Sequence, residues 1–255
     1  MQNLIESTGL NKNFSLGKDH SVNVLKNINL NVRPGEYVSV MGPSGSGKST
    51  LLYTLSGMEP MSSGQVIFNN MVLDNLPEKT MSRLRLTEMG FIFQHIHLLK
   101  NLNLRDNILL PGYLAKLQSR KSVNHRASEL MELTGIACLA ENNITQASGG
   151  QLQRVGICRA LINEPDIVFG DEPTGALDSA STHEVMDLLG RINAMGTTIF
   201  LVTHDVKVAA RSERVLLMRD GRIVSESALG RYTESEGESA DREQRLASWL
   251  WEWGC

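Results

Sequence analysis

Residues 42–50 read GPSGSGKST, and this stretch decides the fold of the chain. It matches the phosphate-binding pattern G-x-x-x-x-G-K-[ST] at every fixed position. The apolar run 37–41 precedes it and the apolar run 51–55 follows it, so the order is strand, glycine loop and helix. The motif needs this context, which disfavours the alternative of a glycine-rich turn without a ligand.

The loop is suited to hold the phosphates of a nucleoside triphosphate. Glycines let the backbone curl so that successive N–H groups point at the phosphates, and the helix N-terminus adds partial positive charge. Lys48 adds a full positive charge, and Ser49 carries a hydroxyl of the kind that holds Mg²⁺. The nucleotide-binding residues expected here are Gly42, Pro43, Ser44, Gly45, Ser46, Gly47, Lys48, Ser49 and Thr50.

Two carboxylates, Asp171 and Glu172, follow the apolar run 165–170. A buried parallel strand ending there delivers both to the carboxyl edge of a sheet, where ligands bind in α/β proteins. Asp171 is then placed to hold Mg²⁺, and Glu172 to polarise an attacking water. An acidic pair after a strand also serves as a helix cap, but downstream of a phosphate loop the ligand role is favoured.

Composition limits the classes of protein to consider. The chain has 255 residues, 41% of them hydrophobic, and a formal charge of −3, which allows one large domain or two small ones. It has no basic excess that predicts a nucleic-acid partner and no apolar run long enough to span a bilayer. The first residues lack the pattern of a secretory signal, so we expect a cytoplasmic location. Cys138, Cys158 and Cys255 lack metal-ligand spacing and are expected to be free thiols.

The remaining pattern predicts an α/β fold. Residues from about 95 to 144 are poor in glycine and carry apolar side chains at helical spacing, as at Ala127, Leu130 and Met131, which predicts an inserted helical lobe. Elsewhere, short apolar runs separated by turns or helical stretches predict strands and, after the lobe, a parallel sheet with crossover helices. The predicted strands are 25–32, 37–41, 65–68, 167–169, 198–202 and 215–218.

Further motifs stand in a fixed order around these strands. Gln94 follows the run GFIF at 90–93, ASGGQLQR at 147–154 precedes the carboxylates, and GALD at 175–178 and THD at 203–205 follow them. With the phosphate loop, this order resembles that of ATP-binding-cassette ATPases over roughly residues 1–225. The resemblance implies a P-loop NTPase core, an N-terminal antiparallel β subdomain and an α-helical subdomain at about 95–145, leaving 226–255 as a tail.

The resemblance also implies roles for single residues. Phe14 matches the aromatic that stacks on the adenine of ATP; the less favoured alternative is a phenylalanine of the core or the surface. Gln94 matches the glutamine that touches Mg²⁺ and senses the γ-phosphate, so the implied metal ligands are Ser49, Gln94 and Asp171. His204 matches the histidine that contacts the γ-phosphate and holds the water in register with Glu172, whereas a lone histidine at a strand end is usually structural. The implied catalytic residues are Glu172, His204 and Gln94.

The ASGGQ segment indicates how many copies of the chain form the nucleotide site. Ser148 and the N–H groups of Gly149 and Gly150 open a helix, which makes this segment an anion site of the helix-terminus type. In the family, that helix of one subunit caps the γ-phosphate held by the other, so two chains enclose two ATP molecules head to tail. We therefore expect a second copy as partner, a nearly inactive monomer, and ATP contacts from Gln151 and Asp178 as well.

The chain departs from the family pattern at two places. Ala147 stands where leucine is usual, and Gly170 stands where a larger aliphatic residue or alanine is usual. Neither change removes a phosphate ligand, so the departures concern packing of the helical lobe rather than catalysis.

Within the family, the segments 90–94, 107–111, 172–179 and 219–221 resemble the branch that serves macrolide and antimicrobial-peptide efflux, bacitracin-type resistance and lipoprotein release. The family resemblance implies a membrane permease docked on residues 95–99, with the chain at the cytoplasmic face of the membrane. Because the chain shows one cassette and no membrane span, we expect that permease to be a separate polypeptide. An amino-acid importer subunit is the alternative. Ribosome-acting cassettes usually carry two cassettes, DNA-repair relatives carry a coiled-coil insertion, and kinases or GTPases need neither ASGGQ nor His204.

The C-terminal stretch has a different character. It is acidic from Ser225 onward, with Glu234 and Glu236 among its carboxylates, and it holds every tryptophan of the chain. The i, i+3, i+4, i+7 spacing of Leu246, Trp249, Leu250 and Trp253 predicts an amphipathic helix. That face either grips a partner or the bilayer surface, or packs on its own domain, and the acidic approach disfavours an anionic membrane.

Overall fold

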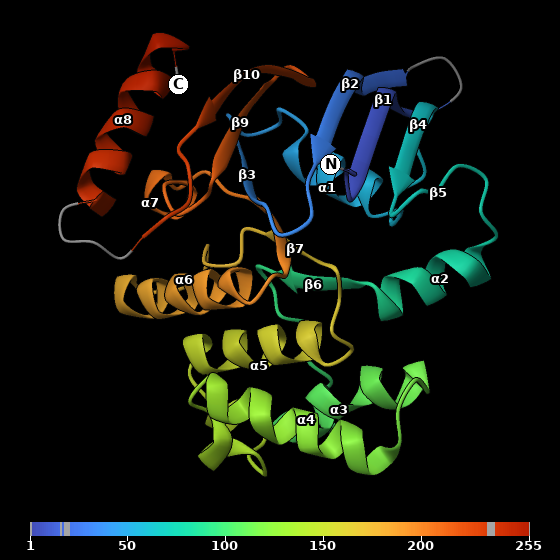
Figure 1. The fold of residues 1–255 in the computed structure, drawn as a ribbon, viewed down its shortest axis with the longest axis vertical. Coiled ribbons are helices and arrows are strands. Elements are labelled where there is room, and N and C mark those ends of the chain that lie inside the picture. Colours follow the sequence, from blue (N-terminus) through green and yellow to red (C-terminus); the bar gives the residue numbers. More distant parts are fainter. Residues whose placement is uncertain (1, 16, 18–20, 234–237, 255) are drawn as a thin grey trace. The chain divides into compact units, whose positions relative to one another are not determined.

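The computed structural model describes residues 2–15, 17, 21–233 and 238–254. The chain divides into two compact units, residues 1–81 with 198–255, and residues 82–197. Figure 1 shows helices and strands in both units, which confirms the predicted α/β class. Glu234, Glu236 and Cys255 lie outside the described residues. In the part that is described, no helix combines the length and the apolar character needed to cross a membrane.

The first unit contains an antiparallel sheet with the strand order β2-β1-β4-β5. Its strands are β1 (Ile5–Ser15), β2 (Ser21–Val32), β4 (Ser63–Phe68) and β5 (Met71–Val72). β1 pairs with both β2 and β4, and its register slips at several points, including one between Lys12 and Asn13. The predicted strands 25–32 and 65–68 are parts of β2 and β4, so the expected antiparallel subdomain is confirmed.

The same unit contains four strands in the order β10-β9-β3-β8. They are β3 (Tyr37–Met41), β8 (Thr198–Val202), β9 (Arg214–Arg219) and β10 (Arg222–Ala228). β3 runs parallel to β8 and β9, while β10 is antiparallel to β9. Every residue of β3 and β8 is buried, as expected of central parallel strands. Helices α1 (Lys48–Leu55) and α7 (Val206–Ala209) follow β3 and β8.

The second unit places helices around two parallel strands, β6 (Met89–Phe93) and β7 (Ile167–Asp171). Its helices are α3 (Leu104–Ala115), α4 (Arg120–Leu133), α5 (Gly149–Leu161) and α6 (Ser179–Ala194), with short 3₁₀ turns η1 (Ala137–Leu139) and η2 (Ile144–Gln146); α2 (Glu78–Thr87) leads to β6. Ala127, Leu130 and Met131 are buried in α4, as their spacing predicts. Cys138 is exposed and Cys158 is buried, both free. Burial raises the pKa of the Cys158 thiol to about 12.

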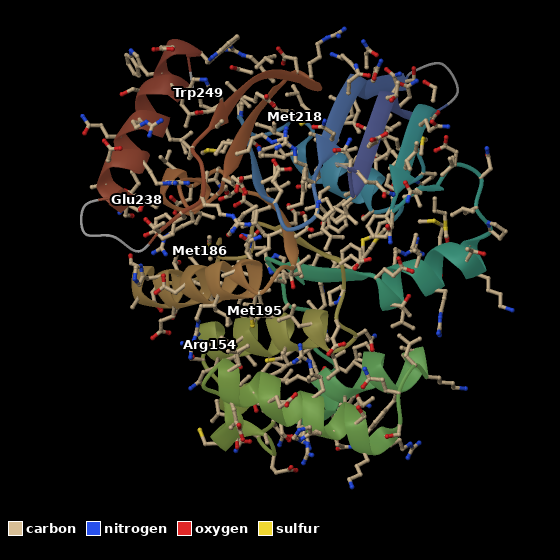
Figure 2. The ribbon with its side chains drawn as sticks, viewed as in Figure 1. Arg154, Met186, Met195, Met218, Glu238 and Trp249 are labelled. Carbon is tan, nitrogen blue, oxygen red and sulfur yellow. The ribbon has the colours of Figure 1, made fainter. Side chains whose placement is uncertain are left out.

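The C-terminal helix α8 (Glu238–Glu252) packs on its own unit, beside α7, β9 and β10 (Figure 1). Leu246 and Leu250 are buried in a cluster that includes Ala209 and Leu217, and Trp249 is partly buried against it. Glu238 and Trp249 lie toward the two ends of the helix in Figure 2. Trp251 points away and is 81% exposed. Of the alternatives for this apolar face, packing on the chain itself is the one observed.

Arg242 anchors α8 to the segments that precede β9 and follow β10. Its side chain is 3% exposed, and its guanidinium donates to the carbonyl oxygens of Ala210 at 2.8 Å, Ser212 at 2.5 Å and Gly230 at 2.9 Å. It also donates to Glu238 at 3.2 Å and lies over the ring of Tyr232. A buried guanidinium is tolerated because its N–H groups find acceptors.

We predict that Arg242→Leu weakens the docking of α8 by about 2–4 kcal/mol, because several buried carbonyl groups lose their donor. All three tryptophans lie at 249–253, so tryptophan fluorescence reports on this helix. In urea, the fluorescence transition of the variant should precede the transition of the backbone circular dichroism. Arg245→Leu is the matched control, since that side chain is 58% exposed on the same helix. Coincident, unshifted transitions in Arg242→Leu would refute the anchoring role.

Candidate functional site

The phosphate loop takes a backbone path that only glycine permits. A Cβ atom on Gly42 would lie 2.0 Å from the carbonyl oxygen of Met218, so no side chain fits there. Gly47, the N-cap of α1, has φ of 99°, in the left-handed region. The loop therefore turns sharply off β3 and directs the chain into α1.

Lys48 bridges the loop from inside. Its side chain is largely buried, and its ammonium donates to the carbonyl oxygens of Gly42 at 2.8 Å and Pro43 at 2.9 Å. Helix α1 has no side-chain cap and no acidic residue in its first turn, so nothing on the helix offsets the positive end of its dipole. Within the described residues, the buried hydroxyl of Ser46 has no hydrogen-bond partner. These features suit a bound anion with several oxygen atoms.

In the second unit, β6 and β7 end side by side. Phe93, the last residue of β6, pairs with Asp171, the last residue of β7. Gln94 and Glu172 directly follow these two strands. A side chain on Gly175 would approach the Gln94 amide nitrogen to 2.9 Å and Cβ of Glu172 to 3.5 Å. The structure thus brings Gln94, Asp171 and Glu172 together at one sheet edge. The strand pattern predicted this edge for the two carboxylates, whereas Gln94 came from the family resemblance and no strand was predicted before it.

Glu172 holds an unusual backbone conformation. Its φ is 48°, a region that non-glycine residues seldom adopt. Such conformations cost about 1–3 kcal/mol and cluster at functional sites. The turn is closed by the Gly175 N–H, which donates to the Glu172 carbonyl at 3.0 Å.

Ser148 begins α5 with a capping box. Its hydroxyl accepts from the Gln151 N–H at 3.3 Å, and the Gln151 side chain accepts from the Ser148 N–H at 2.8 Å. The first N–H groups of a helix have no acceptor within it, so Gly149 and Gly150 present theirs at the tip. Packing also requires a glycine at position 150, because a Cβ atom there would lie 2.7 Å from the Ser181 hydroxyl of α6.

Asp178 caps α6 close to this turn. Its carboxylate accepts from the Ser181 N–H at 2.9 Å and from the Ser181 hydroxyl at 3.0 Å. These hydrogen bonds lower the pKa of the Asp178 carboxyl below its ordinary value, so the group is ionised at neutral pH. A Cβ on Gly149 would lie 3.6 Å from the Leu177 side chain. The two motifs, ASGGQ and GALD, are therefore neighbours.

His204 and Phe14 belong to the first unit. His204 is exposed in the turn between β8 and α7, where the Thr203 hydroxyl accepts from the Asp205 N–H at 3.0 Å. Because the Thr203 N–H donates to the Val40 carbonyl at 3.1 Å, this turn and the phosphate loop leave the same edge of the sheet. Phe14 is half-buried on β1, and the Lys12 ammonium lies 4.6 Å from its ring centroid. Sequence reasoning missed Lys12, although its spacing of two from Phe14 puts both side chains on one face of β1.

The segment 95–99 lies on the surface of the second unit. Arg159 of α5 donates to the carbonyl oxygens of Ile96 at 2.6 Å and His97 at 2.9 Å, and burial lowers the pKa of its guanidinium. A cavity of about 340 Å³ opens beside it, lined by aromatic and basic side chains that include Phe91, Phe93 and His97.

Oxygen donors of the chain fit Mg²⁺. The Ser49 hydroxyl, the Gln94 amide oxygen and the Asp171 carboxylate are hard ligands of the kind this ion prefers. Ser49 lies in the first unit and the other two in the second.

Comparison with known proteins agrees with these observations. Residues 25–175 match the family model described as ABC transporter. The chain is 43% identical over 225 residues, or 88% of its length, to a probable export ATP-binding/permease protein MacB of Pseudomonas entomophila. It is 38% identical over 246 residues, or 96% of its length, to the macrolide export ATP-binding/permease protein MacB of Neisseria gonorrhoeae.

A solved structure of similar fold is the dimeric ATP-binding cassette MJ0796 in a post-hydrolysis state with ADP and phosphate bound. It has a TM-score of 0.82 and 35% identity, and the match covers 89% of this chain and 100% of that one. This chain spans only 33% and 38% of the two MacB proteins. Because the family model covers more than half of its residues, the chain belongs to the ABC transporter family.

Proposed function

We propose that the chain is the nucleotide-binding, ATP-hydrolysing cassette of a membrane transporter, and that it works as a head-to-tail dimer. The phosphate loop carries this proposal. Lys48 lies buried inside the loop, and the uncapped N-terminus of α1 follows directly. Such a loop binds the β- and γ-phosphates through backbone N–H groups and one lysine. Phe14 then stacks on the adenine base.

Hydrolysis is assigned to residues at the sheet edges. Glu172 acts as the general base that accepts a proton from the attacking water, and His204 and Gln94 hold the water and the γ-phosphate in line. Magnesium bound by Ser49, Gln94 and Asp171 would neutralise phosphate charge. The strained backbone at Glu172 supports this assignment, since such conformations cluster at functional sites.

The dimer supplies a second helix N-terminus to each nucleotide. The capping box leaves the N–H groups of Gly149 and Gly150 at the tip of α5, and helix tips of this kind bind phosphate oxygens. We assign this tip, with Ser148, Gln151 and Asp178, to the γ-phosphate held by the other copy. Binding of ATP then closes the dimer and hydrolysis releases it. The dimeric solved cassettes at 35% and 36% identity support this arrangement.

Transport requires a permease that receives this motion. The names of the MacB relatives, one of export and one of macrolide export, support an exporter over the amino-acid importer. We assign the permease contact to residues 95–99 and the adjoining cavity, where Arg159 fixes the backbone and Leu99 is 45% exposed. A cassette docked on such a permease works at the cytoplasmic face of the membrane.

Export and import are distinguished by co-purification. We expect the chain, purified from its native membrane, to be isolated together with a permease that carries a large extracellular domain. Isolation with an importer permease and its solute-binding protein would contradict the export assignment. Arg159→Ala should reduce recovery of the permease without lowering ATP binding, because it frees the backbone of residues 96 and 97.

Glu172→Gln should lower ATP turnover by about 10²–10⁴-fold, because the amide cannot accept the proton. ATP affinity should remain near that of the native chain, and the variant should accumulate as a closed dimer with ATP. ATP turnover is measured by the release of phosphate, and dimer formation is measured by analytical ultracentrifugation. Lys48→Ala is the control that loses tight ATP binding. Rapid turnover by Glu172→Gln would exclude Glu172 as the base.

Ser148→Arg should leave ATP binding to the single chain intact and abolish ATP-dependent dimerisation and hydrolysis, because the arginine blocks the helix tip. The change also removes the cap of α5, which costs about 1 kcal/mol. Ser148→Ala shares that loss without the bulk and is the matched control, expected to keep measurable hydrolysis. Full hydrolysis by Ser148→Arg would rule out capping between the two copies.

A further inference from the structure

Lys12 is a buried cation with three partners. Its side chain is 7% exposed. The ammonium donates to a Glu59 carboxylate oxygen at 2.5 Å and to the Pro60 carbonyl at 2.6 Å, and it lies 4.6 Å from the ring centroid of Phe14. A buried ammonium is stable only where carboxylate, carbonyl or ring faces replace its water. The three groups here meet that requirement.

The β1 backbone brings Lys12 and Phe14 to this position. Side chains two residues apart on a strand share one face. The register slip between Lys12 and Asn13 places its extra residue in β2, because Lys12 pairs with Leu25 and Asn13 with Asn23, so β1 keeps its alternation here. Two hydrogen bonds connect this part of β1 to the segment that contains Glu59. The Asn13 N–H donates to the Ser62 hydroxyl at 2.8 Å, and the Ser62 N–H donates to the Asn11 carbonyl at 2.9 Å.

Glu59 in turn is fixed to the helix of the phosphate loop. Its N–H donates to the carbonyl of Tyr53 in α1 at 3.0 Å, and α1 begins at Lys48. The same helix therefore carries the phosphate-binding lysine at its start and the anchor of Lys12 just beyond its end. All of these contacts lie within the first unit.

We propose that Lys12 is a positioning residue for the nucleotide base. Its ammonium covers one face of the Phe14 ring and fixes the ring, which leaves the other face to stack on adenine. The inference rests on the proposed function through Phe14. Because Lys12 acts on the ring, it governs the part of the affinity that comes from the base and leaves the part that comes from the phosphates unchanged.

The test compares two ligands that share phosphates and differ in the base. Binding of ATP and of inorganic triphosphate is measured by calorimetry in the presence of Mg²⁺. Lys12→Met keeps the aliphatic stem and removes the charge, and it should weaken ATP binding by about threefold to tenfold, the range of a cation–π contact. Triphosphate binding should stay within about twofold, which also shows that the variant is folded. Lys12→Arg should restore ATP affinity. Lys79→Met, at an exposed position of α2, is the matched control.

Phe14→Leu separates this inference from the function on which it rests. We expect Phe14→Leu to weaken ATP but not triphosphate, and Lys12→Met added to it to cause no further loss. Equal loss of ATP and triphosphate in Lys12→Met, or additive losses in the double variant, would overturn the role of Lys12. So would native ATP affinity in Lys12→Met. Native ATP affinity in Phe14→Leu would instead overturn base stacking at Phe14.

Discussion

The position of one carbonyl oxygen constrains the nucleotide-binding half of the molecule. The Met218 carbonyl of β9 lies where a Cβ on Gly42 would have to be, so the chain must turn off β3 at a glycine. Lys48 then closes that turn by donating to the Gly42 and Pro43 carbonyl groups. The position of β9 beside β3 therefore determines where the loop turns, and the loop in turn determines where α1 begins. Just beyond the other end of α1, Glu59 accepts from Lys12, whose ammonium lies over the ring of Phe14.

The second unit uses helix ends in a related way. In α5 the side chains of Ser148 and Gln151 accept from each other's backbone N–H groups, while the N–H groups of Gly149 and Gly150, at the start of the helix, have no acceptor within it. Asp178 caps the neighbouring helix α6, and Glu172 holds a strained φ beside Gln94. Ala147 and Gly170, the two departures from the family pattern, lie outside these contacts. A helix end whose first N–H groups have no acceptor within the helix is suited to hold phosphate oxygens.

Sequence reasoning predicted what depends on local pattern. The bounds of β3 and β8 agree with the predicted runs because buried parallel strands are continuous and apolar. It predicted no strand at 5–15, where Gly9, Asn11 and Asn13 interrupt the alternation and bulges break the register. The buried contacts of Lys12 and Arg242 join residues 47 and 32 positions apart, which spacing does not encode. The spacing of Leu246 and Leu250 predicted the apolar face of α8 but not the surface that it covers.

The claim that two copies of this chain enclose each ATP is tested most directly by a crystal structure of the Glu172→Gln variant with MgATP. The decisive quantity is the distance from the γ-phosphate oxygens, held by Lys48 of one copy, to the Gly149 and Gly150 N–H groups of the other. Our account predicts hydrogen-bond distances, about 2.7–3.2 Å between heavy atoms. An ATP-bound structure in which the Ser148 turn faces solvent would contradict it.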